Sequence, residues 1–97
     1  MLAVTKKIKT GSQTIEALLF PLQGKNLIVL RGSRGYVMCG YLNTSVARKC
    51  NDAAVKITGV ATIADALRAR VHSLTPAARR LGIKKGDIIK DILALIA

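Results

Sequence analysis

Residues 32–42 read Gly-Ser-Arg-Gly-Tyr-Val-Met-Cys-Gly-Tyr-Leu, and the pattern of the sequence changes across this stretch. Its first two glycines bracket a tight turn, and the apolar residues 36–42 predict a strand that leaves the turn. Residues 27–31, Leu-Ile-Val-Leu-Arg, predict the strand that enters it. The stretch therefore predicts a hairpin with strands upstream and short helices downstream. Its glycines are turn and close-packing residues, because a phosphate-binding glycine loop leads into a helix and this one leads into a strand.

Two further strands are predicted upstream of the hairpin. Residues 2–9 alternate weakly and carry three lysines, which is typical of an edge strand protected against unwanted pairing. Residues 14–22 form an apolar run whose end is marked by Pro21. The turn at 23–26 then leads into the strand at 27–31, so the two strands are expected to pair as a hairpin.

The strand at 14–22 is apolar on both faces. By alternation, one face carries Ile15, Ala17 and Leu19, and the other carries Leu18, Phe20 and Leu22. An antiparallel sheet with one solvated face would alternate apolar and polar residues. We therefore expect both faces to be covered, one by helices of this chain and the other by a second copy of the chain.

Residues after the hairpin predict short helices and one more strand. Asn43, Thr44 and Ser45 are candidate N-caps for a helix over 46–51. Residues 54–58, Ala-Val-Lys-Ile-Thr, predict a strand.

Three helices are predicted after that strand. Thr62 is placed to cap the first, with Asp65 in a position that resembles a capping box. Residues 75–76 (Thr-Pro) supply an N-cap and a first-turn proline for the second, which Gly82 ends in a left-handed conformation. The last begins at about Asp87 and buries an isoleucine-rich side.

Together these elements predict an α+β fold in a single domain of 97 residues. An N-terminal antiparallel β-sheet region covers about residues 1–42, and a mixed region at about 43–97 contributes short helices packed on one face. Of all residues 51% are hydrophobic, yet only three are aromatic, so the core is aliphatic. So apolar a composition in so small a chain favours a homo-oligomer, which would bury the excess apolar side chains.

Apolar and cysteine patterns indicate the compartment. No apolar run approaches the roughly 20 residues of a membrane span, and lysines interrupt the N-terminal segment where a signal peptide would be apolar. We therefore expect a cytoplasmic protein with no membrane partner. Cys39 and Cys50 are expected to be free thiols there. Their spacing and the lone His72 match no metal-binding pattern, so neither a metal nor a cofactor is predicted.

The chain is strongly basic, with 16 Lys and Arg against 5 Asp and Glu and a formal net charge of +11. Such a balance is compatible with nucleic acid or another polyanion as a partner. The cations are dispersed, and no run of them resembles a disordered basic arm. A solvated basic surface and a polyanion site therefore both remain open.

Residues 35–42, Gly-Tyr-Val-Met-Cys-Gly-Tyr-Leu, resemble the signature of the YunC-like proteins, the domain of unknown function 1805. The resemblance continues at residues 59–67 and 78–86, in the same order and at similar spacing. It implies an α+β fold whose N-terminal β region forms a tetramer, and it implies no established activity. This chain departs from the pattern at Asn43, where many relatives have aspartate, and at Ile89, where relatives tend to have glycine.

Cys39 is the candidate nucleophile or redox thiol. A reactive cysteine needs a nearby cation, a helix N-terminus or a paired histidine to lower its pKa. Arg34 lies across the predicted hairpin turn, so it is the candidate cation. The alternative is a buried structural cysteine, because Cys39 lies within an apolar strand.

Residues 75–93 resemble a helix-turn-helix, with Gly82 in the turn. The second helix would then enter the major groove of DNA. Asp87 and Asp91 on that helix oppose this interpretation, because they would repel phosphates. The candidate phosphate-binding residues are Arg79, Arg80, Lys84, Lys85 and Lys90.

Three classes of function thus follow from the sequence. The first is a structural or interaction module without catalysis, which the lack of a convergent set of acids, bases or metal ligands favours. The second is a nucleic-acid-binding protein that uses residues 75–93. The third is a small enzyme that uses Cys39.

Overall fold

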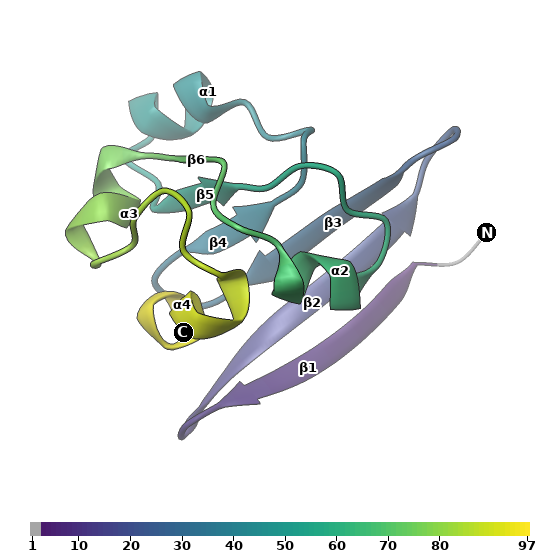
Figure 1. Cartoon of the computed structure of the whole chain (residues 1–97), viewed down its shortest axis with the longest axis horizontal. Helices are drawn as coiled ribbons and strands as arrows, with labels where there is room; N and C mark the ends of the chain where they lie inside the picture. The colour runs from purple at the N-terminus through teal and green to yellow at the C-terminus, as the bar shows by residue number, and fades with distance from the viewer. Residues whose placement is uncertain (1–2) are drawn as a thin grey trace.

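The structure is a computed structural model that describes residues 3–97, and within them one mixed sheet of six strands carries four short helices (Figure 1). The strands are β1 (Val4–Thr10), β2 (Gln13–Pro21), β3 (Asn26–Arg31), β4 (Tyr36–Met38), β5 (Ala54–Lys56) and β6 (Ser73–Leu74). The helices are α1 (Thr44–Lys49), α2 (Ile63–Arg68), α3 (Pro76–Arg80) and α4 (Ile89–Ile96). The predicted α+β fold is confirmed.

The strands lie in the sheet in the order in which they occur in the chain. β1 to β4 form an antiparallel meander, as the sequence predicts. β5 then pairs parallel to β4, because the segment that joins them contains α1 and crosses back over the sheet. The predicted strand at 2–9 corresponds to β1, and its first residue, Leu2, lies outside the described residues.

Two strand predictions need correction. The strand predicted over 36–42 ends at Met38, because the N–H of Leu42 bonds to the carbonyl of Cys39 (3.0 Å) and turns the chain. The second concerns Ser73 and Leu74, just before the predicted helix cap at Thr75: no strand is predicted there, but these two residues form β6 and pair antiparallel with β5.

The predicted alternation in β2 is confirmed by burial. Ile15 and Ala17 are buried at 0% and 2% exposure, whereas Phe20 on the opposite face is 45% exposed. In Figure 1, α2 and α4 lie over the same side of the sheet. α4 begins at Ile89, two residues later than predicted, and buries a helical stripe made of Ile89, Ile92, Leu93 and Ile96. The main core therefore lies between the sheet and these helices.

α1 departs from the prediction that the helices pack on one face. Ala47 of α1 packs with Leu42 and Ala54, and with the half-buried Tyr36 and Met38. Ala54 pairs with Tyr36 in register, whereas their sheet neighbours Val37 and Val55 belong to the main core. Because successive side chains of a strand point to opposite faces, α1 covers the other face of β4 and β5.

The turn at 32–35 holds the end of α4. A Cβ atom at Gly32 would overlap the carbonyl oxygen of Ile96, and one at Gly35 would lie 2.7 Å from the carbonyl oxygen of Ala53. Ser33 Oγ donates a hydrogen bond to the carbonyl of Ala97 (2.6 Å). The first two glycines of the opening stretch are therefore the close-packing residues that the sequence predicts.

Candidate functional site

The parallel strands β4 and β5 end side by side, and a hollow of about 590 Å³ opens beyond their carboxyl ends. In open α/β sheets, ligands bind beyond the carboxyl ends of parallel strands. We call this feature the end hollow. Three segments line it, namely the β2–β3 turn, the residues after β4 and the residues after β5: Gly24, Lys25, Asn26, Cys39, Gly40, Tyr41, Thr58, Gly59, Val60 and Ala61.

Cys39 lies in the wall of the end hollow and is only 4% exposed. Its Sγ accepts a hydrogen bond from the N–H of Ile28 (3.4 Å) and donates to the carbonyl of Asn26 (3.8 Å). The thiol is thus held against β3 and not presented to solvent, an arrangement typical of a structural cysteine. Both Cys39 and Cys50 are free thiols, as predicted.

Arg34 and Cys39 lie at opposite ends of β4, so the structure does not bring these two candidate residues together. The guanidinium of Arg34 donates to the carbonyl of Ala94 (2.8 Å), and its backbone N–H donates to the carbonyl of Ile96 (2.9 Å). Arg34 therefore fastens the C-terminal end of α4 to the hairpin turn.

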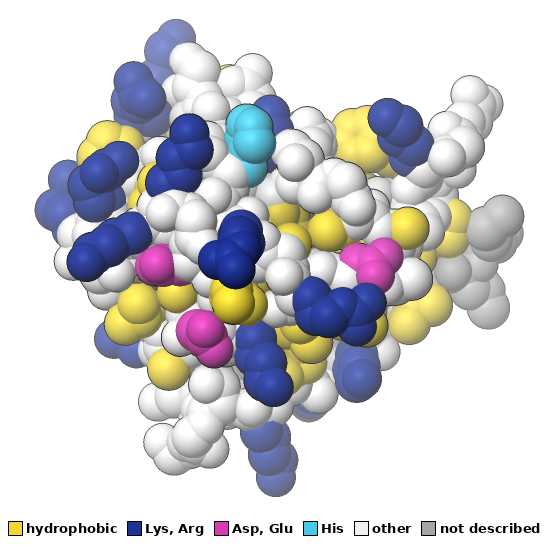
Figure 2. All heavy atoms as spheres, viewed as in Figure 1, with side chains coloured by type: hydrophobic (Ala, Val, Ile, Leu, Met, Phe, Trp, Pro, Cys, Tyr) yellow, Lys and Arg dark blue, Asp and Glu magenta, His cyan; other side chains and the backbone are white. Residues whose placement is uncertain are grey.

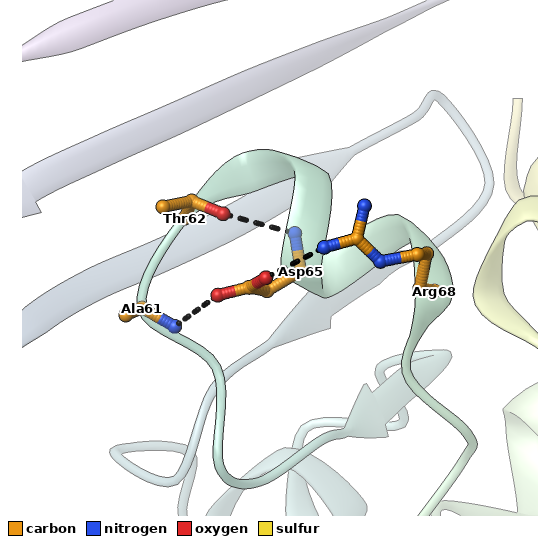
Figure 3. Close-up of polar contacts among 4 residues, drawn as sticks. All are labelled: Ala61, Thr62, Asp65 and Arg68. Carbon is orange, nitrogen blue, oxygen red and sulfur yellow. Dashed lines mark hydrogen bonds and ion pairs between the residues drawn. The ribbon is translucent and has the colours of Figure 1, made fainter.

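The far wall of the end hollow is fixed by hydrogen bonds to Ala61. Its carbonyl accepts from the side-chain amide of Asn26 (2.9 Å), and its N–H donates to a carboxylate oxygen of Asp65 (3.2 Å). Figure 3 shows the same carboxylate meeting Arg68 (2.9 Å), while Thr62 Oγ1 accepts from the N–H of Asp65 (3.0 Å). The hydrogen bond from Ala61 is the main cause that holds the pKa of Asp65 below its usual value. The predicted Thr62 cap is confirmed. Asp65 returns a hydrogen bond to the backbone before the helix, as in a capping box, and its partner is the N–H of Ala61.

Residues 75–93 do not form a helix-turn-helix. α3 has five residues and is separated from α4 by residues 81–88, whereas the turn of that motif has about three or four residues. The apolar stripe of α4 is buried in the main core. The candidate cations Arg79, Arg80, Lys84, Lys85 and Lys90 are exposed.

Positive charge is spread over much of the molecule. On the face that Figure 2 shows, Lys and Arg side chains are distributed widely, with a group toward the side where Figure 1 places α3. Among residues 3–97, ion pairs join only Arg31 to Glu16 and Arg68 to Asp65. Most cations thus face solvent, so polyanion binding would depend on their charge and not on a helix-turn-helix.

Over the same range of residues, no group of three or more His, Cys, Asp or Glu side chains comes close enough to hold a metal ion. His72 is exposed beside Ser73, with its Nδ1 3.5 Å from the hydroxyl oxygen. None of the helices in the described part of the chain has the length and apolarity needed to cross a bilayer.

A second feature is the face of β1–β3 opposite the main core, which we call the outer face. A hollow of about 380 Å³ lies on it. In register, Leu18 pairs with Val29, and Glu16 lies between Lys7 and Arg31. The hydrogen bond from Arg31 holds the pKa of Glu16 below its usual value. The outer face consists of Thr5, Lys7, Glu16, Leu18, Phe20, Val29 and Arg31.

Fold and site together define a small α+β domain in which a parallel strand pair extends an antiparallel meander. The chain belongs to the family described as Domain of unknown function (DUF1805), whose model matches residues 38–96. It is also similar to the crystal structure of TA1206, a protein of unknown function from Thermoplasma acidophilum. That similarity has a TM-score of 0.94 and 31% sequence identity, and it covers 99% of this chain and 94% of that chain. No curated protein matches the chain at a significant level.

Sequence reasoning found Cys39 but missed most of the end hollow. Lys25 was interpreted only as a turn residue, and Thr58 only as the end of a strand. The available signal was the order of a strand, a short helix and a strand over residues 36–58, which is typical of a parallel pair with a crossover.

Proposed function

We propose that this protein is a cytoplasmic interaction module that assembles with copies of itself through the outer face of β1–β3. The observation that carries the proposal is the apolar centre of a sheet face that no helix of the described chain covers. Leu18 and Val29 are only half-buried there, and Phe20 is 45% exposed. The resemblance to the YunC-like family favours a tetramer as the assembled form.

The charges of the outer face suit contact with an identical face. The row Lys7–Glu16–Arg31 alternates in sign, so it carries much less net charge than its cations alone would give. In a two-fold symmetric contact the same patch occurs on both sides and must complement itself. The row of alternating charges lies beside the apolar row of Leu18 and Val29, and this arrangement meets that requirement. A wholly basic face would repel its copy.

The test compares two variants that add the same charge to opposite faces. Leu18→Glu introduces a carboxylate at the apolar centre of the outer face, and Ala64→Glu introduces one at an exposed position on α2. Multi-angle light scattering measures the mass of each. We expect an oligomer for the wild type and for Ala64→Glu at micromolar concentration. For Leu18→Glu we expect a dissociation constant at least about tenfold higher, because the carboxylate would be buried without a partner.

Two results would contradict the proposal. One is a monomeric wild-type protein across that concentration range. The other is equal dissociation of both variants, which would place the contact elsewhere. Circular dichroism of Leu18→Glu separates loss of assembly from loss of folding.

A further inference from the structure

We propose that the end hollow binds a small anionic molecule, one that carries a phosphate or a carboxylate group. This site is separate from the outer face and goes beyond the proposed assembly function. A volume of about 590 Å³ lies within the range of small-molecule sites, roughly 300–1,000 Å³.

The ionisable groups of the lining favour an anion. Lys25 is the cation that lines the end hollow, and no Asp or Glu lines it. Lys25 is exposed and makes no ion pair with any residue in the range 3–97. A cationic ligand would therefore meet repulsion, and an anionic one would find an uncommitted ammonium group.

The backbone of the lining includes hydrogen-bond donors that have no partner within the described chain. The carbonyls of Asn26, Cys39 and Ala61 already accept hydrogen bonds, from Cys39 Sγ, the N–H of Leu42 and the Asn26 side chain. The carbonyl of Lys25 accepts from the N–H of Leu22. The N–H groups of residues 40–41 and 58–60 donate to no acceptor within the described chain, and the carbonyls of these residues accept no hydrogen bond there, so Lys25 decides the sign of the favoured ligand. Uncommitted backbone donors bind anions.

Gly40 is the glycine that the fold of one chain does not explain. Gly24 and Gly59 have φ values of +74° and +70°, where glycine is favoured, and Gly32 is packed against Ile96. Gly40 has no positive φ, and a Cβ atom there would meet nothing within 4 Å. Its missing side chain leaves open space in the wall of the end hollow, next to an uncommitted N–H.

The wall is also held in place before any ligand arrives. Ala61 is hydrogen-bonded through both its carbonyl and its N–H, to Asn26 and Asp65. Cys39 is fixed to β3 through its thiol. A ligand would thus lose less free energy to ordering the protein than it would in a site made of free loops.

An NMR titration of the ¹⁵N-labelled full chain tests the site. The probes are glycerol phosphate, succinate and uncharged glycerol. We expect saturable shifts confined to the amides of residues 24–26, 39–41 and 58–61 for at least one anion, and none for glycerol. Comparison of the two anions distinguishes a phosphate site from a carboxylate site. Shifts spread evenly over the exposed cations, or no saturable shift with either anion, would overturn the proposal.

Two variants locate the binding. Lys25→Gln removes the cation of the hollow, whereas Lys85→Gln removes a matched exposed lysine after α3. We expect about tenfold weaker binding for the first and no change for the second. Gly40→Val places a branched side chain in the hollow and should weaken binding while the melting temperature changes little, because the new side chain enters open space. Binding unaffected by Gly40→Val would contradict the site. Repeating the titration on Leu18→Glu separates this proposal from the assembly function.

Discussion

At the scale of single residues, Asp52 and Thr75 tie the second half of the chain together. Thr75 is 1% exposed, and its hydroxyl donates to the carbonyl of Asp52 (2.6 Å) and accepts from the N–H groups of Ala54 (3.0 Å) and Ala78 (3.3 Å). The carboxylate of Asp52 accepts from the hydroxyl of Tyr36 (2.8 Å). One loop thus joins β4, β5 and α3, and among the described residues every buried side-chain nitrogen or oxygen has a hydrogen-bond partner.

The bond between Tyr36 and Asp52 should make stability depend on pH in the alkaline range. Partial burial, and then the Asp52 carboxylate, raise the pKa of Tyr36 from 10.0 to about 12. The folded protein therefore keeps a proton that the unfolded chain loses. The stabilisation that the protonated Tyr36 hydroxyl contributes is complete below pH 10 and is lost as the pH rises through about 12.

Tyr36→Phe should lower the free energy of unfolding by about 1 kcal/mol at neutral pH, the usual contribution of such a hydrogen bond. That difference from the wild type should shrink as the pH rises from 10 to 12. Urea denaturation at each pH measures it. Tyr41→Phe, at a tyrosine that is 50% exposed, is the matched control and should change stability little. A difference for Tyr36→Phe that stays constant with pH would show that the hydroxyl bond is not its cause.

At the scale of elements, helix caps and hairpin partners could be predicted from the sequence, whereas the partners of β5 and β6 could not. Thr62 and Thr75 were identified as caps and Asn43 as one of three candidates, and each accepts a hydrogen bond from the first turn of its helix. A cap is local, because its side chain reaches an N–H only two or three residues ahead. β6 has two residues, too few for an alternating pattern, and it forms only because Val55 and Lys56 offer an edge to it.

The cap of α2 should respond to acid. The pKa of Asp65 is lowered by the hydrogen bond from Ala61, with smaller contributions from Thr62 and Arg68. The stabilisation is therefore present above the ordinary carboxyl pKa of 3.8 and is lost as the pH falls through the lower value of the folded state.

Asp65→Asn keeps the shape and one acceptor oxygen but removes the charge. We expect it to be less stable than the wild type at neutral pH, with the difference disappearing toward pH of about 2. Thermal unfolding across that range measures the difference. Asp91→Asn is the control, at an exposed carboxylate on α4 that makes no ion pair with any described residue. Equal acid sensitivity of both variants would contradict the role of the cap.

At the scale of the whole molecule, the fold class and the two-sided sheet could be predicted, but the end hollow could not. The apolar residues of β2 alone predict that both faces of the sheet are covered, and the structure confirms this for the face that carries the main core. The end hollow depends on the parallel pairing of β4 with β5, which brings residues 39–41 beside residues 58–61. The sequence shows β4 and β5 as strands but does not show that they pair with each other. The prediction placed α1 on the same face as the other helices for the same reason, because the direction of the crossover decides which face of β4 and β5 it covers.

Net charge should make assembly and polyanion binding respond to salt in opposite ways. Each copy carries a formal charge of +11, so copies repel one another, and in the proposed assembly the apolar outer faces would supply the attraction. Raising the ionic strength from about 0.1 to about 1 M shortens the screening length from roughly 10 to 3 Å, which weakens the repulsion and leaves the apolar contact. Binding to nucleic acid weakens over the same range, because it depends on released counterions.

We therefore expect self-association to tighten severalfold as salt rises, measured by sedimentation velocity on the wild type. Leu18→Glu should remain weakly associated throughout, because salt cannot restore its apolar contact. An oligomer that dissociates at high salt would instead show that ion pairs such as Lys7 with Glu16 of a neighbouring copy hold it together. In that case the charged row, and not the apolar row of Leu18 and Val29, would be the part of the outer face that drives assembly.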